Sequence, residues 1–176
     1  MESYMNIGTI NRTFDTEVAE SFVKCMLSDI SEHLGYFTKD ELDRTVRYFD
    51  YKCPYTGQDI RQSFYDDDYV IDYLIPMDIS SWGLHLYGNI IVTTREVLKR
   101  KRRNFFENFI YHCTEGTEEE RIQRIEKIRN FQEPYLFHYR KIQKNEALKE
   151  LCKSKYNSIL EQLEKLESDY LSIIHR

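Results

Sequence analysis

Glycine and proline are scarce in this chain, and they are unevenly distributed. The 176 residues include 6 Gly and 3 Pro. Most of them lie in one stretch, from Tyr51 to Val92, at Pro54, Gly57, Pro76, Gly83 and Gly88. Both residue types interrupt helices. The distribution therefore predicts long helices on either side of a central segment of short strands and loops.

The hydrophobic pattern supports helices on the N-terminal side. From Asp15 to Leu34, apolar residues recur at the spacing of one helix face. They are Val18, Phe22, Val23, Met26, Leu27, Ile30 and Leu34. A second helix should begin at Thr38, because Glu41 completes a capping box in which the two side chains bind free backbone amides. Its core side should carry Leu42, Val46 and Phe49.

A similar capping box, Thr117 to Glu120, predicts the start of a helix on the C-terminal side. This helix should end at Pro134, and one face should carry Ile122, Ile125, Ile128 and Phe131. From Asn145 to Ile174, apolar residues stand at near-heptad intervals and predict one long helix. Its apolar seam either packs on the domain, which the shortness of the heptad run favours, or forms a coiled-coil dimer.

The central segment has two runs typical of strands, Tyr69-Val70-Ile71 and Ile90-Ile91-Val92. From Thr93 the pattern becomes helical and predicts a short helix followed by a second one. We expect a single domain over residues 1–176. Its parts would be N-terminal helices over 14–50, a core over 51–112 and C-terminal helices over 117–176.

Net charge and the distribution of apolar residues limit the kinds of function that this chain can have. The formal net charge of -5 argues against a surface that binds nucleic acid everywhere, so any such binding needs a local basic patch. The chain has no apolar run of membrane-spanning length and a polar N-terminus without a signal peptide. We therefore expect a cytoplasmic protein that does not bind membranes.

The cysteines predict neither a zinc knuckle nor a disulfide framework. They stand far apart, at Cys25, Cys53, Cys113 and Cys152, without a C-x-x-C pair. We expect free, buried thiols and no structural zinc.

Three segments occur in an order that resembles the centre of HNH endonucleases. Residues 53–57 read C-P-Y-T-G, residues 71–76 read I-D-Y-L-I-P, and residues 83–95 read G-L-H-L-Y-G-N-I-I-V-T-T-R, with Lys101 after them. The corresponding family patterns are C-x-Y-T-G, I-D-H-I-I-P and G-L-H-x-x-G-N-L-V-P-T. The resemblance implies an α+β fold, mainly helical, whose central ββα-metal hairpin-helix unit is flanked by N-terminal and C-terminal helices.

The same resemblance implies site residues, and this sequence departs from the pattern at two of them. Asp72 stands where the family has a metal ligand, and Asn89 where it has the asparagine that braces the loop. Tyr73 replaces the histidine that acts as general base, and a phenol is protonated at neutral pH. Leu98 replaces the last His or Asn, a second metal ligand. The sequence thus resembles an HNH endonuclease that has lost its general base, at Tyr73, and one metal ligand, at Leu98.

Rescue of the chemistry by neighbouring residues is an alternative. His85 in the loop and Glu96 near Leu98 could complete a rearranged site with Asp72, which would then use Mg²⁺ or Mn²⁺. Against this, His85 matches a histidine that the intact pattern already contains. Glu96 lies two positions from Leu98 and therefore on another helix face. Without rescue, we expect no cofactor.

Two charged runs are candidate binding surfaces. Lys99, Arg100, Lys101, Arg102 and Arg103 form a basic run that either holds nucleic-acid phosphates or is a solvated helix face. Asp66, Asp67 and Asp68 form an acidic run that repels phosphates. It is a solvated hairpin tip or a surface for a protein partner.

These observations leave three hypotheses about function. The first is a catalytically degenerate HNH-like protein that binds a nucleic acid or a nuclease or nucleoprotein partner, one version being a phage or mobile-element inhibitor of a host defence nuclease. The second is an active, metal-dependent endonuclease of restriction or defence type with a rearranged site. The third is a structural or assembly protein that shares only the scaffold.

Overall fold

The computed structural model describes residues 7–35, 37–102 and 104–174. These described residues are mainly helical with one small antiparallel sheet, so the α+β class is confirmed. The strands are β1 (Val70–Tyr73) and β2 (Ile90–Thr93). The helices are α1 (Ile7–Leu34), α2 (Lys39–Tyr48), α3 (Arg61–Tyr65), α4 (Arg95–Lys101), α5 (Phe106–Cys113), α6 (Glu118–Gln143) and α7 (Glu146–Ile174).

The sheet lies where the sequence predicts it. Val70 pairs with Thr93 and Tyr73 with Ile90, and the pairing continues through a hydrogen bond of 2.9 Å from Leu74 N to Asn89 O. All four residues of β2 are buried. The two strands are joined by a long loop, residues 74–89, and α4 follows β2 after the single residue Thr94. One strand thus lies in the core and the other beside it.

Both predicted capping boxes are present. The Thr38 hydroxyl accepts from Glu41 N at 3.3 Å, and Thr38 N donates to the Glu41 carboxylate at 3.0 Å. At the start of α6, the matching distances between Thr117 and Glu120 are 3.2 and 2.7 Å. These bonds fix where α2 and α6 begin because they satisfy amides that have no partner within the helix.

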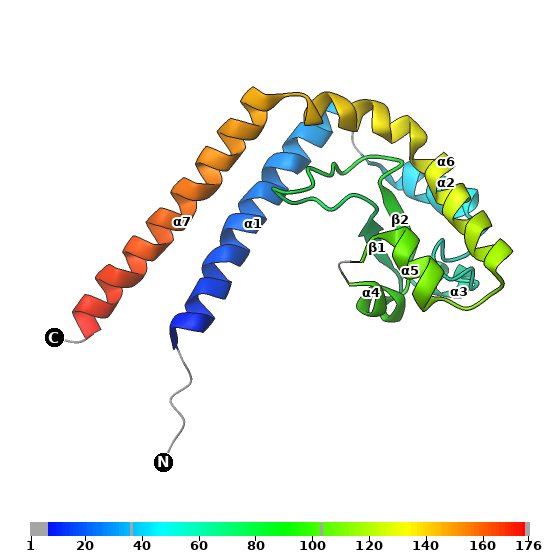
Figure 1. Ribbon diagram of the computed structural model, residues 1–176, viewed down its shortest axis with the longest axis horizontal. Helices are drawn as coiled ribbons and strands as arrows, with labels where there is room; N and C mark the ends of the chain where they lie inside the picture. The colour runs from blue at the N-terminus through cyan, green and yellow to red at the C-terminus, as the bar shows by residue number, and fades with distance from the viewer. Residues whose placement is uncertain (1–6, 36, 103, 175–176) are drawn as a thin grey trace, which may run out of the picture.

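Two predictions about α6 are wrong. Pro134 lies inside the helix, which continues to Gln143 and curves over the core (Figure 1). Proline removes one helical hydrogen bond, but Phe131 and Tyr135 on either side are buried, and this packing keeps the helix together. Ile122 does not face the core: it is 43% exposed, whereas Ile125 and the residues after it on that face are buried.

The core has two apolar clusters. The first lies between α2, β2, α5 and α6 and contains Phe49, Tyr55, Val92, Phe109 and Phe131 among others. The second joins the loop 74–89 to α1, α6 and α7, and its buried members include Leu27, Trp82, Leu84, Tyr135 and Cys152. The loop between the strands is therefore part of the core, although it has no regular structure.

Helices α1 and α7 form an arm. Figure 1 shows them side by side and running in opposite directions, with the start of α1 and the end of α7 at the far end. Cys152 is buried in the second cluster together with Val23 and Leu27 of α1, and Tyr156 is partly buried. Farther along α7, Leu166 and Ile173 are exposed. The favoured interpretation of the seam is thus confirmed for the first half of α7, and the coiled-coil dimer stays a prediction.

The cysteines match the prediction only in part. All four are free, and Cys53 and Cys152 are buried. The prediction of buried thiols is wrong for Cys25 and Cys113, which are exposed on α1 and α5. Among the described helices, none has the length and apolar character needed to cross a membrane.

Candidate functional site

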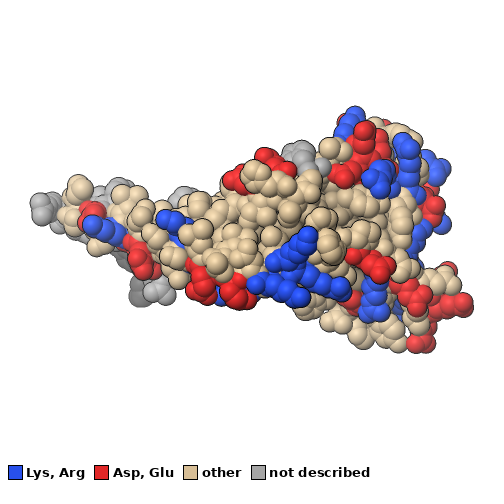
Figure 2. All heavy atoms as spheres, turned by 90° about the horizontal axis from the view of Figure 1, so that it is seen from above, with Lys and Arg blue, Asp and Glu red and all other residues tan. Residues whose placement is uncertain are grey.

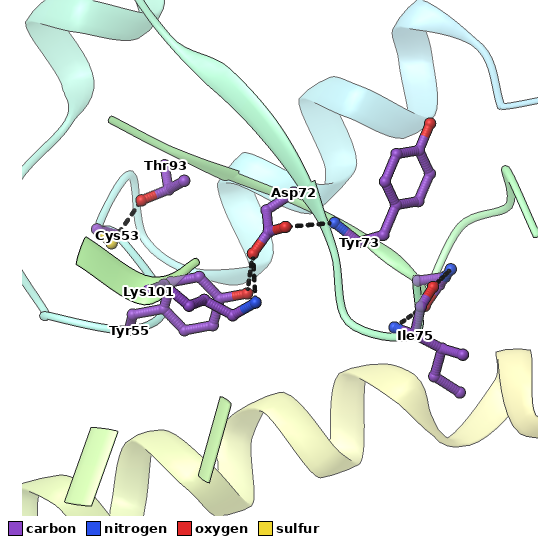
Figure 3. A network of polar contacts seen from close by, with 8 residues as sticks. Cys53, Tyr55, Asp72, Tyr73, Ile75, Thr93 and Lys101 are labelled. Atoms are coloured by element: carbon purple, nitrogen blue, oxygen red, sulfur yellow. Dashed lines mark hydrogen bonds and ion pairs between the residues drawn. The ribbon is translucent and has the colours of Figure 1, made fainter. Parts of the chain in front are cut away.

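Asp72 is held by three donors from three parts of the chain (Figure 3). The Tyr55 hydroxyl donates to Oδ2 at 2.6 Å, and Lys101 Nζ lies 3.0 Å from the same oxygen. The backbone N–H of Tyr73 donates to Oδ1 at 2.9 Å. The side chains of Lys101 and Asp72 are only 7% and 13% exposed. This is an ion pair largely removed from water.

Local structure brings Tyr55 and Lys101 to this carboxylate. Tyr55 lies in a turn closed by a hydrogen bond of 2.8 Å from Gly57 N to Cys53 O, and its ring packs edge-on against Phe109. Lys101 is the last residue of α4, which begins at the N-cap Thr94 directly after β2. Its ammonium also lies 5.4 Å from the centre of the Tyr55 ring.

Tyr55 remains a donor under all ordinary conditions. Burial raises the pKa of its phenol well above the usual value, and the neighbouring Asp72 carboxylate raises it further. A protonated phenol donates to the carboxylate, so the hydroxyl stabilises the negative charge of Asp72.

The residues at Asp72 do not fit a divalent metal ion. Both carboxylate oxygens of Asp72 already accept hydrogen bonds. The Lys101 ammonium, 3.0 Å from Oδ2, would repel a metal ion bound to the same carboxylate. Mg²⁺ and Mn²⁺ need several oxygen ligands. Leu98 is partly buried and supplies none. Within the described residues, no group of three or more His, Cys, Asp or Glu side chains could hold a metal.

Tyr73 and His85 form a second polar pair. The phenol oxygen lies 2.7 Å from His85 Nδ1. Burial raises the pKa of Tyr73 and lowers the pKa of His85, so both groups are neutral near pH 7. The His85 backbone N–H donates to the Ser31 hydroxyl of α1 at 2.8 Å, which ties the loop to the arm.

The two polar pairs lie on different sides of β1. Consecutive residues of a strand point to opposite faces, and Figure 3 shows the Tyr73 ring directed away from the Asp72 carboxylate. Asp72 contacts Tyr55 of the first apolar cluster, whereas Tyr73 packs against the second. Glu96 is exposed on α4. The structure therefore does not bring Asp72, His85 and Glu96 together.

Asn89 holds the loop in place from within. Its side chain is fully buried and bonds both backbone groups of Ile75, with Oδ1 accepting at 2.7 Å and Nδ2 donating at 2.9 Å. Nδ2 also donates to Leu84 O at 2.9 Å. Gly83 lies nearby, and an added Cβ there would overlap the Ile75 carbonyl oxygen. Only glycine permits this close approach.

The basic run does not form one solvated face. Lys99, Arg100 and Arg102 are exposed, whereas Lys101 is buried against Asp72. Arg100 donates to Cys113 O at 2.6 Å. Arg103 lies outside the described residues. Elsewhere, Lys and Arg side chains gather over the α6–α7 junction, with Asp and Glu side chains beside them (Figure 2). Exposed cations there include Arg140, Lys141 and Lys144.

The acidic run forms an exposed turn between α3 and β1. Asp66 accepts a hydrogen bond of 2.6 Å from Gln62, and Asp68 lies 3.6 Å from Arg95. Asp67 has a positive φ of 54°, which a short polar side chain tolerates. The three carboxylates remain open to solvent.

Sequence reasoning missed two features. Tyr55 and Lys101 stood in segments that it had singled out, but their joint contact with Asp72 is a tertiary relation that spacing does not reveal. The contact of Tyr65 with Tyr51 was also missed, because the two residues are distant in sequence and spacing does not show that their rings meet. Comparison with family models, with curated proteins and with solved structures gave no match to this chain.

Proposed function

We propose that this chain is a nuclease-derived ββα scaffold of HNH type that no longer carries out metal-dependent cleavage. In this proposal it acts by binding a nucleic acid or a nuclease or nucleoprotein partner. The observation that carries the proposal is the ion pair between Lys101 and Asp72 at 3.0 Å.

The order of the elements supports the scaffold. A turn at Cys53–Gly57 precedes β1, a long loop braced by Asn89 leads to β2, and α4 follows at once. Gly83 and Asn89 serve this loop through backbone fit and hydrogen bonds rather than chemistry. A scaffold with these requirements can be kept when catalysis is lost.

Charge supports the loss of catalysis. In a metal-dependent nuclease the aspartate would balance the charge of the metal ion. Here the Lys101 ammonium supplies that positive charge internally, and Tyr55 binds the same oxygen. The remaining positions offer neither a base nor a ligand, because Tyr73 is protonated and Leu98 is apolar.

Binding could use either of two charged surfaces. The exposed members of the basic run suit phosphates. The acidic turn at Asp66–Asp68 suits a basic protein surface, such as the nucleic-acid channel of a nuclease. The second alternative is the inhibitor hypothesis, in which carboxylates imitate phosphates.

One observation favours the rearranged endonuclease as a second candidate. His85 is neutral and hydrogen-bonded to Tyr73, so its imidazole has the protonation state of a general base. It would have to act without Asp72, because the two side chains lie on different sides of β1.

A nicking assay separates the two candidates. Supercoiled plasmid is incubated with the protein and Mg²⁺ or Mn²⁺, and Asp72→Ala and His85→Ala variants serve as matched controls. The proposal expects the wild type to nick no more than the variants do. Metal-dependent nicking that disappears in either variant would support the second candidate. A pull-down from host extract, with identification of bound protein and nucleic acid, then tests the binding role.

A further inference from the structure

An aromatic stack with one exposed ring lies at the end of α3. The rings of Tyr51 and Tyr65 are 6.0 Å apart between centroids, with an angle of 29° between their planes. Tyr65 is 66% exposed. Tyr51 covers part of the Tyr65 ring and Phe64 lies 5.9 Å from it between centroids, yet most of Tyr65 is open to solvent.

A cationic side chain, that of Arg61, lies against this stack. The Arg61 guanidinium lies 5.0 Å from the centre of the Tyr51 ring. The interaction with Tyr51 raises the pKa of Tyr65, and the charge of Arg61 acts in the opposite direction. All of these side chains except that of Tyr51 are exposed.

The backbone that presents Tyr51 is strained. Asp50 and Tyr51 both have a φ of 57°, a conformation that is unusual for an aromatic residue. Hydrogen bonds of 2.9 Å from Tyr51 N to Val46 O and from Ile60 N to Tyr51 O hold the segment in place. Strain of this kind gathers at functional sites.

We propose that Tyr65, supported by Tyr51 and with Arg61 beside it, is a stacking platform for an unpaired base of a single-stranded nucleic acid. The exposed part of the Tyr65 ring binds the base, and the Arg61 guanidinium binds a neighbouring phosphate. This deepens the nucleic-acid branch of the proposed function and rests on it.

The surroundings favour a single strand over a duplex. Bases inside a duplex are stacked on each other and offer no face to a surface tyrosine. The adjacent turn at Asp66–Asp68 is negatively charged, which disfavours a duplex, with its two phosphate backbones, more than a single strand.

Fluorescence anisotropy tests the proposal on the full chain, with labelled oligo-dT, oligo-U and a duplex of mixed sequence as probes. We expect both single strands to bind more tightly than the duplex. Tyr65→Leu keeps apolar bulk but removes the π face, and it should weaken binding about tenfold. Tyr65→Phe keeps the ring and should bind within about threefold of the wild type. Arg61→Ala should weaken binding and reduce its salt dependence.

Matched controls lie elsewhere on the surface. Tyr111 is also exposed, but its hydroxyl donates to Glu118, and Tyr111→Leu should leave binding unchanged. Arg129 is an exposed arginine near Glu107, and Arg129→Ala is the control for Arg61→Ala. Equal affinity for duplex and single strands, equal effects of Tyr65→Leu and Tyr111→Leu, or no binding of any probe would each overturn the platform. None of these results bears on the nicking assay, so the loss of catalysis is tested separately.

Discussion

Lys101 Nζ lies 3.0 Å from Asp72 Oδ2, and both side chains are almost closed to solvent. A carboxylate in such a place needs a positive partner, because an isolated buried charge is very costly. The fold supplies the partner from the end of α4. A carboxylate held in this way contributes to the structure of the protein and has little capacity left for a metal ion.

The first prediction concerns this ion pair. Lys101→Met should lower the free energy of unfolding by about 3–5 kcal/mol, because it leaves the Asp72 charge buried without a partner. Urea denaturation measures the change. Lys99→Met, on the exposed side of the same helix, is the control and should change stability by no more than about 0.5 kcal/mol. Similar losses in the two variants would mean that the pair is not a buried charge interaction.

The second prediction concerns the Tyr55 hydroxyl. Tyr55→Phe keeps the buried ring but removes the donor to Asp72, and should cost about 1.5–3 kcal/mol, the range for a hydrogen bond to a charged group. Tyr111→Phe removes a hydroxyl that also donates to a carboxylate, that of Glu118 at 3.0 Å, but at an exposed position. This control should lose much less stability than Tyr55→Phe. A smaller loss for Tyr55→Phe than for Tyr111→Phe would contradict the role assigned to Tyr55.

The third prediction concerns pH. Burial lowers the pKa of His85 in the folded protein below the usual value of 6.5. Below that pH the unfolded chain binds a proton that the folded chain does not, so the His85 contribution makes stability fall as the solution is acidified from pH 7.5 to 5. His85→Gln should reduce this dependence when unfolding free energies are compared across the range.

Tyr73→Phe is the informative control for the pH dependence. It removes the hydrogen bond to His85 Nδ1 but keeps the aromatic ring that helps bury the imidazole. Since burial is the cause of the lowered pKa, the variant should lose about 1 kcal/mol of stability yet keep the pH dependence. An unchanged dependence in His85→Gln would show that other groups cause it.

Local signals predicted much of the fold. The two capping boxes, the apolar runs at Tyr69–Ile71 and Ile90–Val92 and the heptad-like spacing after Asn145 each depend on neighbours in sequence, and the corresponding elements form. The end of α6 was wrong at Pro134, because packing of Phe131 and Tyr135 outweighs the lost hydrogen bond. Helix α3 was not predicted, since five residues give too little periodicity.

The candidate site was less predictable, because its contacts join residues that are distant in sequence. The basic run could be read from the sequence, but the burial of Lys101 could not, because it depends on a carboxylate on β1. Likewise, the pair of Tyr73 and His85 joins a strand to a loop. Motif positions identify residues to examine, and only the fold shows which of them meet.

Binding of Mn²⁺ measured by electron paramagnetic resonance tests the central claim most directly. The signal of free hydrated Mn²⁺ is followed during titration into the wild type and Asp72→Ala. If Asp72 is committed to Lys101 and Tyr55, the two proteins should remove the same small amount of Mn²⁺ from solution. Binding of one equivalent by the wild type that is lost in Asp72→Ala would contradict this account.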